Sequence, residues 1–488
     1  MADSRDHTRA PIHPPEEEIA GEADAPGRLV IAILVVAAAA FSFAFQETGI
    51  IPSLVRIQRT LPGATTSTVT FLESGYLVLA AISATTLGRL GDRRGKKPVM
   101  LMAMGCYMAG AIGAAFAPNL AVLVVFRSLQ GVGGAIFALS LALMRKLAGN
   151  KLQIAVSGII AGFGLGITAG FASSGVISAN LGWRYIFAIE SMLIMIAGVL
   201  VWRFLPDDGE RSDVPRDLTS SLLLGGGVGA LLLSITLGPV EGWSSWEVLF
   251  IGSVVIPLLV AWWVRSQRID QPLVRVSVLT ERNVLLPNLA AGLAGYAAFS
   301  TYLVIPRLAL TPTHLAVLPG FHAGLGLALT ALGLLMMPIG IGTLVGSALG
   351  GAAAGRVGGK WSFAAGMCLL ALGPALLAAE RVDLAAIGVW LFVTGVGFGS
   401  SVSAAGTLII EAAPEGETGV ATSINTLSRL TLGGIGSQVG TIILIIGRYH
   451  GLSVSHPFDY DLPFVIAAGL ALLGALLVAF VTPRPTAR

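Results

Sequence analysis

The chain has 488 residues, of which 55% are hydrophobic and only 12% are charged. An ordinary soluble domain is about 25% charged, so this composition excludes a water-soluble globule and indicates a membrane protein. The net charge of +3 is small for 488 residues and does not by itself require nucleic acid as a partner.

The cysteines and histidines give no sign of a bound metal. Cys106 and Cys368 both lie inside apolar runs, where neither a disulfide framework nor a metal cluster is expected. The histidines lack zinc-binding spacing, and the sequence contains no phosphate-binding Gly-x-x-x-x-Gly-Lys-Ser/Thr loop. We therefore expect no enzyme activity, no catalytic residue, no metal and no cofactor.

The chain opens with an acidic, proline-rich segment, residues 1–28, which lacks the basic start and apolar centre of a signal peptide. Such a segment predicts a disordered tail. About fourteen apolar runs of roughly 20 residues follow, and this is the length that an α-helix needs to cross a bilayer. The predicted spans are 29–51, 67–87, 99–117, 120–144, 152–179, 183–205, 218–238, 246–264, 284–305, 324–349, 361–379, 384–411, 419–447 and 463–481.

The distribution of positive charge predicts how these helices are oriented. An even number of spans puts both termini on one side of the membrane. Roughly 22 of the 30 Lys and Arg fall on that side, and about six fall on the other. Because cations in short loops favour the cytoplasm, both termini are predicted to be cytoplasmic.

An internal repeat predicts how the spans are grouped. Small and basic residues after the second span recur after the tenth span, in the pairs Gly88 and Gly351, Arg93 and Arg356, Gly95 and Gly358, and Lys97 and Lys360. Transporters are often built from such parallel repeats. We therefore predict an all-α membrane protein with two six-helix bundles, residues 29–205 and 284–482. Segment 206–264 is a linker with an inserted helix pair, 265–283 is a second linker, and 483–488 is a cytoplasmic tail.

Two motifs carry a resemblance to a known family. The stretch GRLGDRRGKK, from Gly88, resembles the signature loop of the major facilitator superfamily, and RSLQGVGGA, from Arg127, resembles its fourth-helix motif. The stretches WRYIF from Trp183 and GVATSINTLSRLTLGGIG from Gly419, with the fourteen spans, resemble its drug:proton antiporter branch. The resemblance covers nearly all of residues 29–481 and implies a secondary transporter.

The sequence departs from that branch at two places. The first helix of the branch usually carries an aspartate about nine residues before a proline. Here the proline is Pro52, Phe43 stands at the acid's place, and Glu47 lies one turn nearer the outside. The fifth-helix antiporter motif normally reads Gly-Pro, where this chain has Gly170 and Phe171. The departures keep an importer, or a dedicated exporter of a lipid or natural product, as alternatives.

Four ionisable residues of the first bundle lie inside predicted spans. They are Glu47, Glu73, Arg127 and Glu190. Each lies about 7–10 Å from the outer end of its helix, and charges inside a bilayer are costly, so these residues are candidate functional groups. We hypothesise that Glu47 carries a proton, that Arg127 tunes it and that Glu73 is a coupled second acid. In the alternative, the side chains only reach the outer headgroups, and Arg184 neutralises Glu190.

The second bundle carries one cation near mid-membrane, Arg429 in the thirteenth span, with no carboxylate predicted at that depth. Its partner could be a substrate group, backbone carbonyls or a carboxylate of the first bundle. Arg429 and Asn425, one turn apart, are therefore possible substrate contacts. A purely structural role for Arg429 is the alternative.

The fifth span carries a stripe of small residues, which recur every four positions. They are Gly158, Gly162, Gly166, Gly170 and Ser174. Small residues at this spacing let two helices approach until their backbones touch. In the resembled family this helix runs along the boundary between the bundles, so we expect a sliding interface. Static packing is the alternative.

The cation-rich connection after the second span has two interpretations. Its cations alone are enough to fix topology. The resemblance also implies a latch that closes the inward side between the bundles, made by Gly88, Asp92, Arg93, Gly95 and Lys97. We expect Asp92 to pair with Arg93 or another cation. We expect Arg94 and Lys96 to matter little.

These features predict a secondary transporter of the inner membrane, multi-pass and monomeric. The favoured activity is proton-coupled efflux of an amphipathic antibiotic, drug or toxic metabolite by alternating access. The expected partners are the small-molecule substrate, protons and the lipid bilayer, and no nucleic acid. A membrane sensor or assembly partner without transport is the alternative from another class. Such a protein would not need the carboxylates near the outer ends of the spans.

Overall fold

The computed structural model describes residues 26–62, 64, 68–207, 217–269, 279–313, 324–412, 418–446 and 457–482. Most of the two predicted tails lies outside these residues, as do residues 208–216 and 270–278 of the two predicted linker segments. The helices are α2 (Pro26–Gly49), α3 (Leu54–Thr60), α4 (Phe71–Arg94), α5 (Lys96–Ala115), α6 (Leu120–Gln130), α7 (Gly134–Ala148), α8 (Leu152–Asn180), α9 (Arg184–Phe204), α10 (Leu218–Glu241), α11 (Trp246–Arg268), α13 (Arg282–Leu310), α14 (Leu329–Val357), α15 (Gly359–Ala379), α16 (Leu384–Ala412), α17 (Thr418–Ile446) and α18 (Pro457–Ala479).

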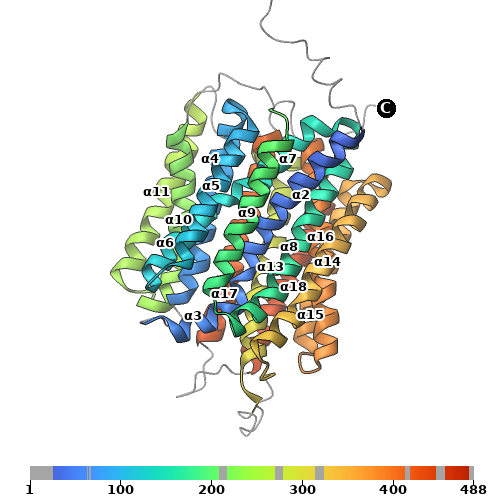
Figure 1. Ribbon diagram of the computed structural model, residues 1–488. Helices are drawn as coiled ribbons and strands as arrows, with labels where there is room; N and C mark the ends of the chain where they lie inside the picture. The colour runs from blue at the N-terminus through green and yellow to red at the C-terminus, as the bar shows by residue number, and fades with distance from the viewer. Residues whose placement is uncertain are drawn as a thin grey trace, which may run out of the picture.

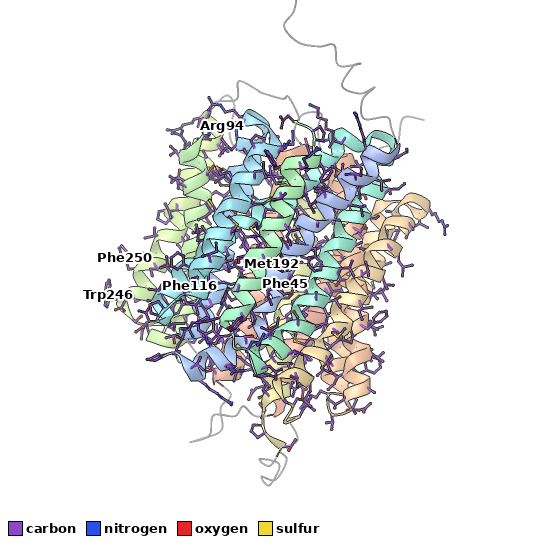
Figure 2. All side chains as sticks on the ribbon, viewed as in Figure 1. Phe45, Arg94, Phe116, Met192, Trp246 and Phe250 are labelled. Carbon is purple, nitrogen blue, oxygen red and sulfur yellow. The ribbon has the colours of Figure 1, made fainter. Side chains whose placement is uncertain are left out.

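The helices run side by side in one elongated bundle (Figure 1). Within the described residues, 14 helical segments are long and apolar enough to cross a membrane, which confirms the predicted number of spans. The first of these segments joins α2 to α3, and the fourth joins α6 to α7. We call the end of the bundle where α4 stops the Arg94 end, and Figure 2 labels this residue there.

Two sets of six helices pack in the same internal pattern. The first set is α2 and α4 to α9, with α6 and α7 as one span, and the second set is α13 to α18. In both sets the first helix packs along the fifth, α2 on α8 and α13 on α17. In both sets the third helix packs on the sixth, α5 on α9 and α15 on α18. This is the arrangement expected of a parallel repeat.

The repeat extends to the backbone conformation of two glycines. Gly95 separates α4 from α5 with φ 94° and ψ 142°, and Gly358 separates α14 from α15 with φ 88° and ψ 151°. Residues with a side chain rarely adopt this conformation. The predicted spans 67–87 and 99–117 left too long a connection here. The helix α4 continues to Arg94 and α5 begins at Lys96, so Gly95 alone connects them. Hydropathy did not predict the end of α4, because the hydropathy of the sequence falls where the charged residues begin, whereas the helix continues through them.

Replacing Gly358 with alanine should lower the free energy of unfolding by about 1–3 kcal/mol, because the backbone there strongly disfavours a side chain. Steric collision is not involved, since no atom lies within 4 Å of the position of an added Cβ. The matched control is Gly388→Ala in α16, where the added Cβ also meets open space but the backbone is helical. Alanine favours a helix, so the control substitution should not lower the free energy of unfolding of the protein. Thermal unfolding of the purified proteins measures both, and equal effects would contradict the prediction.

The inserted pair, α10 and α11, packs on one side of the bundle. Gly225 of α10 lies against Ile82 of α4, and Leu232 of α10 lies next to Gly434 of α17. Because α4 belongs to the first set and α17 to the second, the pair covers the seam where these two helices meet. Figure 1 shows α10 and α11 at the edge of the bundle beside α4.

The outer surface of the bundle is apolar. Trp246 and Phe250 project from α11 and are 72% and 63% exposed, and Phe116, beyond the end of α5, is 81% exposed (Figure 2). Large apolar side chains spread over helices of this length suit contact with lipid rather than with water.

Asp217 joins the two helices of the inserted pair at the Arg94 end. Its Oδ1 accepts a hydrogen bond from the backbone N–H of Ser220, at 3.1 Å, which caps α10. It also accepts one from Nη2 of Arg265 in α11, at 3.3 Å. Burial raises the pKa of Asp217, but the hydrogen bonds from Ser220 and the charge of Arg265 outweigh it and hold the pKa below its usual value.

The inserted pair should therefore lose stability in acid. A carboxylate with a lowered pKa contributes stability above its unfolded-state pKa of about 4, and the contribution is lost as the pH falls through the lower folded-state pKa. Asp217→Asn should unfold at a lower temperature than the parent at pH 7, and this difference should shrink below about pH 4. Thermal unfolding across pH measures it. A difference that does not change with pH would contradict the prediction.

Candidate functional site

The fourth span is distorted where it approaches α4. Between α6 and α7 the chain forms a 3₁₀ turn, Gly131–Gly133. A side chain at Gly131 would collide with the backbone carbonyl of Tyr76, so glycine is needed for this approach. Ser83 of α4 donates a hydrogen bond to the carbonyl of Gly131, at 3.2 Å. The distortion holds the end of α6, which carries Arg127, close to α4.

Arg127 is the centre of a buried polar network. Its side chain is fully buried, and Nη1 donates to Oε1 of Gln130 at 2.8 Å. Nη2 donates to the backbone carbonyl of Gln46 in α2, at 3.1 Å. The guanidinium lies 4.5 Å from the centroid of the Tyr76 ring. Oε2 of Glu73 lies 3.9 Å from Nη2, which makes an ion pair without a hydrogen bond. Arg127 thus joins α6 to α2 and α4.

Gln130 extends this network to α9. Its Nε2 donates to Oε2 of Glu190 at 2.9 Å, and both side chains are fully buried. The alternative in which Arg184 neutralises Glu190 is wrong. Arg184 instead donates to the backbone carbonyl of Ala117, at 2.9 Å, and lies over the ring of Trp183. Arg184 is the first residue of α9, about 9 Å from Glu190 along the helix.

Glu47 lies in the last turns of α2 and is only 4% exposed. It interacts electrostatically with Arg429 of the second set, and with Glu73 and Arg127 of its own set. No ion pair or hydrogen bond joins its carboxylate to a described cation. Glu47 therefore interacts electrostatically with two arginines that belong to different halves of the molecule.

Arg429 of α17 is buried at the seam between the two sets. Its guanidinium lies over two rings of the first set, 5.1 Å from the centroid of Phe137 and 5.8 Å from that of Phe163. Its Nε has no hydrogen-bond partner among the described residues. Of the partners weighed for this cation, the structure supports a carboxylate of the first set, because Glu47 interacts with it across the seam.

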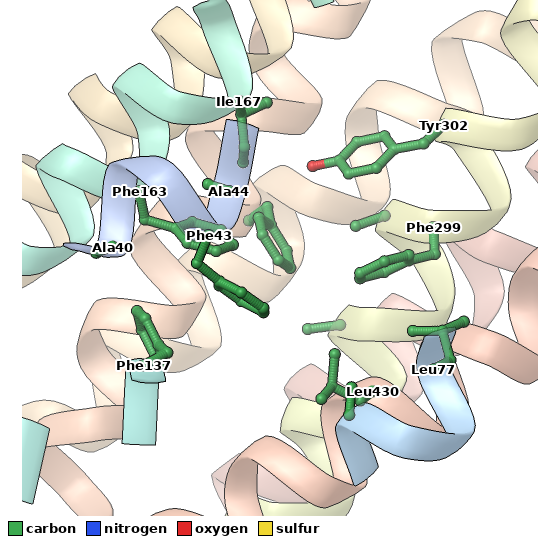
Figure 3. Packing of buried hydrophobic residues seen from close by; sticks show 14 of the residues in the cluster. Ala40, Phe43, Ala44, Leu77, Phe137, Phe163, Ile167, Phe299, Tyr302 and Leu430 are labelled. Atoms are coloured by element: carbon green, nitrogen blue, oxygen red, sulfur yellow. The ribbon is translucent and has the colours of Figure 1, made fainter. Parts of the chain in front are cut away.

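Aromatic side chains of both sets face the same interior region (Figure 3). Phe137 and Phe163 come from the first set, with ring centroids 5.4 Å apart. Phe299 and Tyr302 come from α13 of the second set, with centroids 5.7 Å apart. An edge-to-face contact between Phe171 of α8 and Tyr302 crosses from one set to the other. The seam near Arg429 is therefore apolar and aromatic.

A small pocket, with room for about one water molecule, lies between the two sets, in the half of the bundle nearer the Arg94 end. It is lined by Phe137, Leu141, Val156, Ile160, Val402, Gly406, Ile409 and Asn425. Asn425 carries the only polar side chain among these residues, and its Nδ2 has no described hydrogen-bond partner. Arg429 follows Asn425 by one turn of α17, about 6 Å further from the Arg94 end. Its guanidinium lies over the ring of Phe137, which lines the pocket.

Two residues of this site, Gln130 and Phe137, were not predicted from the sequence. Gln130 follows Arg127 by three positions, which places both on one face of a helix, so the spacing within RSLQ could have identified it. No local signal marks Phe137, because its role depends on a helix of the other set.

Two lysines in the region of the predicted latch, Lys96 and Lys97, have partners within or next to the first set. Nζ of Lys96 lies 3.7 Å from Oδ1 of Asp92 and is largely buried. Lys96 is thus the cation that pairs with Asp92, and the expectation that replacing Lys96 matters little stays a prediction. Lys97 donates to the backbone carbonyl of Leu205, at 2.7 Å, and pairs with Asp207 at 3.2 Å. These contacts fasten α4 and α5 to the end of α9, and the latch between bundles stays a prediction.

The stripe of small residues on α8 faces α2, and its expected position at the boundary between the bundles is wrong. Added Cβ atoms at the glycines of this stripe would meet α2, with the pairs Gly158 and Ile33, Gly162 and Ala37, Gly166 and Phe41, and Gly170 and Thr48. The stripe therefore provides packing inside the first set.

A different face of α8 meets the second set. An added Cβ at Gly164 would lie 2.7 Å from the backbone nitrogen of Leu344 in α14. Gly340 of α14 lies against Thr168, four residues after Gly164. The helix thus has two small-residue faces, and the recurrence of small residues every four positions marks the face that packs on α2.

Comparison with protein families gives a match over most of the chain. The family model described as Major Facilitator Superfamily matches residues 36–437 and 313–488.

Curated relatives are similar at low identity. The "Uncharacterized MFS-type transporter YvkA" of Bacillus subtilis is 27% identical over 49% of this chain and 54% of its own length. The "Multidrug transporter protein MdtP" of the same species is 24% identical over 75% of this chain and 66% of its own length. The match thus spans less than two thirds of either relative. The "Tetracenomycin C resistance and export protein" of Streptomyces glaucescens is 25% identical over 86% of this chain and 76% of its own.

Solved structures of transporters share the fold. The Escherichia coli xylose transporter XylE, in a partially occluded inward-open conformation, superposes with a TM-score of 0.63 at 13% identity, covering 95% of this chain and 99% of its own. The human organic anion transporter MFSD10 superposes with a TM-score of 0.61 at 16% identity, covering 93% and 99%.

Proposed function

This chain belongs to the major facilitator superfamily, and we propose that it exports amphipathic small molecules, coupled to protons, by alternating access. Membership makes it a multi-pass integral membrane transporter and not an enzyme. The names of two relatives, a multidrug transporter and a tetracenomycin C resistance and export protein, support export of toxic compounds.

The observation that carries the proposal is that the buried Glu47 interacts electrostatically with Arg127 of its own set and with Arg429 of the other. In alternating access the two bundles rock against each other around a site between them. Rocking changes the distance from Glu47 to Arg429, which is on the other bundle, and leaves Arg127 in the same bundle as Glu47. The charge around Glu47 then differs between the two states, and such a change can bind or release a proton.

Glu73 and Glu190 have supporting roles in this proposal. Both are buried and both connect to Arg127, Glu73 directly and Glu190 through Gln130. We assign Glu73 as a second acid coupled to Glu47, since like charges sharing a site titrate together. Glu190 serves to orient Gln130 and thereby Arg127.

We also propose that the Arg94 end faces the cytoplasm, because the cation-rich connections of the chain lie on that side. The pocket between the bundles lies in that half. The exporter would thus capture its substrate from the cytoplasm or the inner leaflet, and both termini would be cytoplasmic.

Purified protein in liposomes tests the proposal with a panel of labelled amphipathic compounds. Proton antiport predicts accumulation when the lumen is acidic, because protons leaving the vesicle drive substrate in. Accumulation driven by an acidic exterior would instead indicate symport, as in an importer. If neither gradient drives any compound, the protein does not couple transport to protons, and the proposal is wrong.

A further inference from the structure

We propose that a groove between the bundles, at the end of the molecule opposite the Arg94 end, binds an anionic phospholipid, whose phosphate pairs with Arg56 and Arg59. The ligand is distinct from the transported substrate. The inference therefore does not depend on the direction of transport or on coupling to protons.

The groove lies where the two bundles meet beside α3. It is partly open and has a volume of about 550 Å³, within the range of small-molecule sites, roughly 300–1,000 Å³. Residues of α3 and α8 line it from the first bundle, and the end of α13 and the start of α14 line it from the second. Figure 1 shows α3 at this end of the molecule. A ligand in the groove would contact both bundles.

The wall that carries the arginines is held firmly on the first bundle. Just before α3, the buried hydroxyl of Ser53 lies 3.1 Å from that of Ser174 in α8, which makes a hydrogen bond. At the end of α3, Nε1 of Trp183 donates to Oγ1 of Thr60 at 3.0 Å. Both ends of this short helix are therefore fixed, and the two arginines between them are presented from a stable base.

The opposite wall is apolar and belongs to the second bundle. The backbone N–H of Leu327 donates to the carbonyl of Ala309 at 2.8 Å, which holds the segment before α14 against the end of α13. Leu327, Leu310 and Leu329 line the groove on this side. The groove thus has a cationic wall and an apolar wall, which suits an amphipathic ligand with an acidic headgroup.

No acidic side chain offsets the charge of the two arginines. They are three residues apart on α3, so they lie on the same side of it. The residues that line the groove include no carboxylate, and in the described part of the chain neither arginine forms an ion pair. The connections 61–67 and 311–328 at this end contain no Asp or Glu. Guanidinium groups pair well with phosphate oxygens, often through two hydrogen bonds.

The surroundings of the groove favour a phospholipid over a soluble anion. The groove lies at the ends of membrane-length helices, which is the level of lipid headgroups. Val176 lies on the same side of α8 as Ala179 of the groove and is 44% exposed. Leu334 lies on the same side of α14 as Thr330 of the groove and is 58% exposed. An acyl chain that leaves the groove would therefore continue over exposed apolar side chains.

Dioctanoyl phosphatidylglycerol and dioctanoyl phosphatidylcholine provide the test, because they share their acyl chains and differ in net charge. The purified protein in detergent receives an equimolar mixture, and native mass spectrometry measures which lipid it retains first. Phosphatidylglycerol should be preferred by at least about tenfold. Equal retention of the two lipids by the wild-type protein would overturn the proposal. The comparison needs no variant and no ion gradient, so its outcome is independent of the proposed transport.

A soluble phosphate ester separates the two sources of a phosphate group. Glycerol 3-phosphate carries the headgroup chemistry without acyl chains, and at the same concentration it should not displace phosphatidylglycerol. Displacement would show that the groove takes a soluble anion, and the assignment to a lipid would be wrong.

Variants of the arginines locate the preference. The double variant Arg56→Gln with Arg59→Gln should lose it, and the double variant with lysines should keep most of it, because lysine retains the charge. The matched control is Arg94→Gln with Arg268→Gln, which removes two exposed arginines at the other end of the molecule and should keep the preference. A preference that survives in the folded glutamine variant, or that falls as much in the control, would overturn the role of the groove.

A further variant tests the groove while keeping both arginines. Ala179 is exposed at the end of α8 and lines the groove, so the ring of Ala179→Trp should fill part of it. Retention of phosphatidylglycerol should fall at least about fivefold, which corresponds to about 1 kcal/mol of binding free energy. Unchanged retention by folded Ala179→Trp would place the lipid outside the groove and contradict the proposal.

Discussion

A reconstituted Glu47→Gln protein is expected to lose all accumulation of substrate driven by a pH gradient, down to the level of protein-free vesicles. Glutamine keeps the size of the side chain but cannot take up a proton. Glu47 is buried and is the carboxylate that interacts with both Arg127 and Arg429, so we expect that the coupled acid Glu73 does not replace it. Exchange of labelled for unlabelled substrate across the membrane needs no net proton movement and should persist.

The control for this experiment is Glu247→Gln, in the first turn of α11. It removes a carboxylate from the inserted pair, away from the seam of the two bundles, and should leave gradient-driven accumulation unchanged. If Glu47→Gln still accumulates substrate from a pH gradient alone, Glu47 is not the proton carrier. The same assay on Glu73→Gln would then test the second acid.

Gly166→Leu is expected to prevent the first bundle from folding normally. An added Cβ at Gly166 would collide with the carbonyl oxygen of Phe41 and lie 2.8 Å from Cβ of Ala44, both on α2. Backbone atoms cannot rotate away, so α2 and α8 must separate. We expect a loss of at least about 3 kcal/mol, at the upper end of the usual cost of overpacking. Folded protein recovered by size-exclusion chromatography measures the effect.

The matched control is Gly198→Leu in α9, where no atom lies within 4 Å of the added Cβ. It makes the same chemical change in a helix interior and should give folded, active protein. A Gly166→Leu protein that folds normally but does not transport would contradict the assignment of static packing. That result would instead support the sliding interface predicted for the stripe.

The spans were predictable because hydrocarbon thickness sets their length and because apolar runs are plain in a chain this hydrophobic. The repeat was predictable from Gly95 and Gly358, since a conformation restricted to glycine leaves a mark in the sequence. Helix ends were not predictable by the same means. The segment from Gly88 to Arg94 is rich in charged residues but is helical. Hydropathy indicates where the hydrocarbon ends, which is not where the helix ends.

The candidate site was predictable in its members and not in its contacts. Charges inside a membrane are costly, so Glu47 and Arg429 stand out in the sequence. Their neighbours depend on how each helix is rotated about its axis, and a single sequence does not fix this rotation. For that reason Arg184, and not Gln130, was considered as a partner of Glu190, and the stripe of small residues on α8 was expected at the boundary between the bundles.

The inserted pair makes the two sides of the transporter unequal towards the bilayer. The repeat would leave two equivalent seams, α4 against α17 and α8 against α14, but α10 covers the first of them. The second is bordered by lipid-facing side chains such as Leu165 of α8 and Leu334 of α14. Among the described residues, the bilayer therefore reaches the boundary between the bundles directly only on the α8 and α14 side, where the two helices are closely packed.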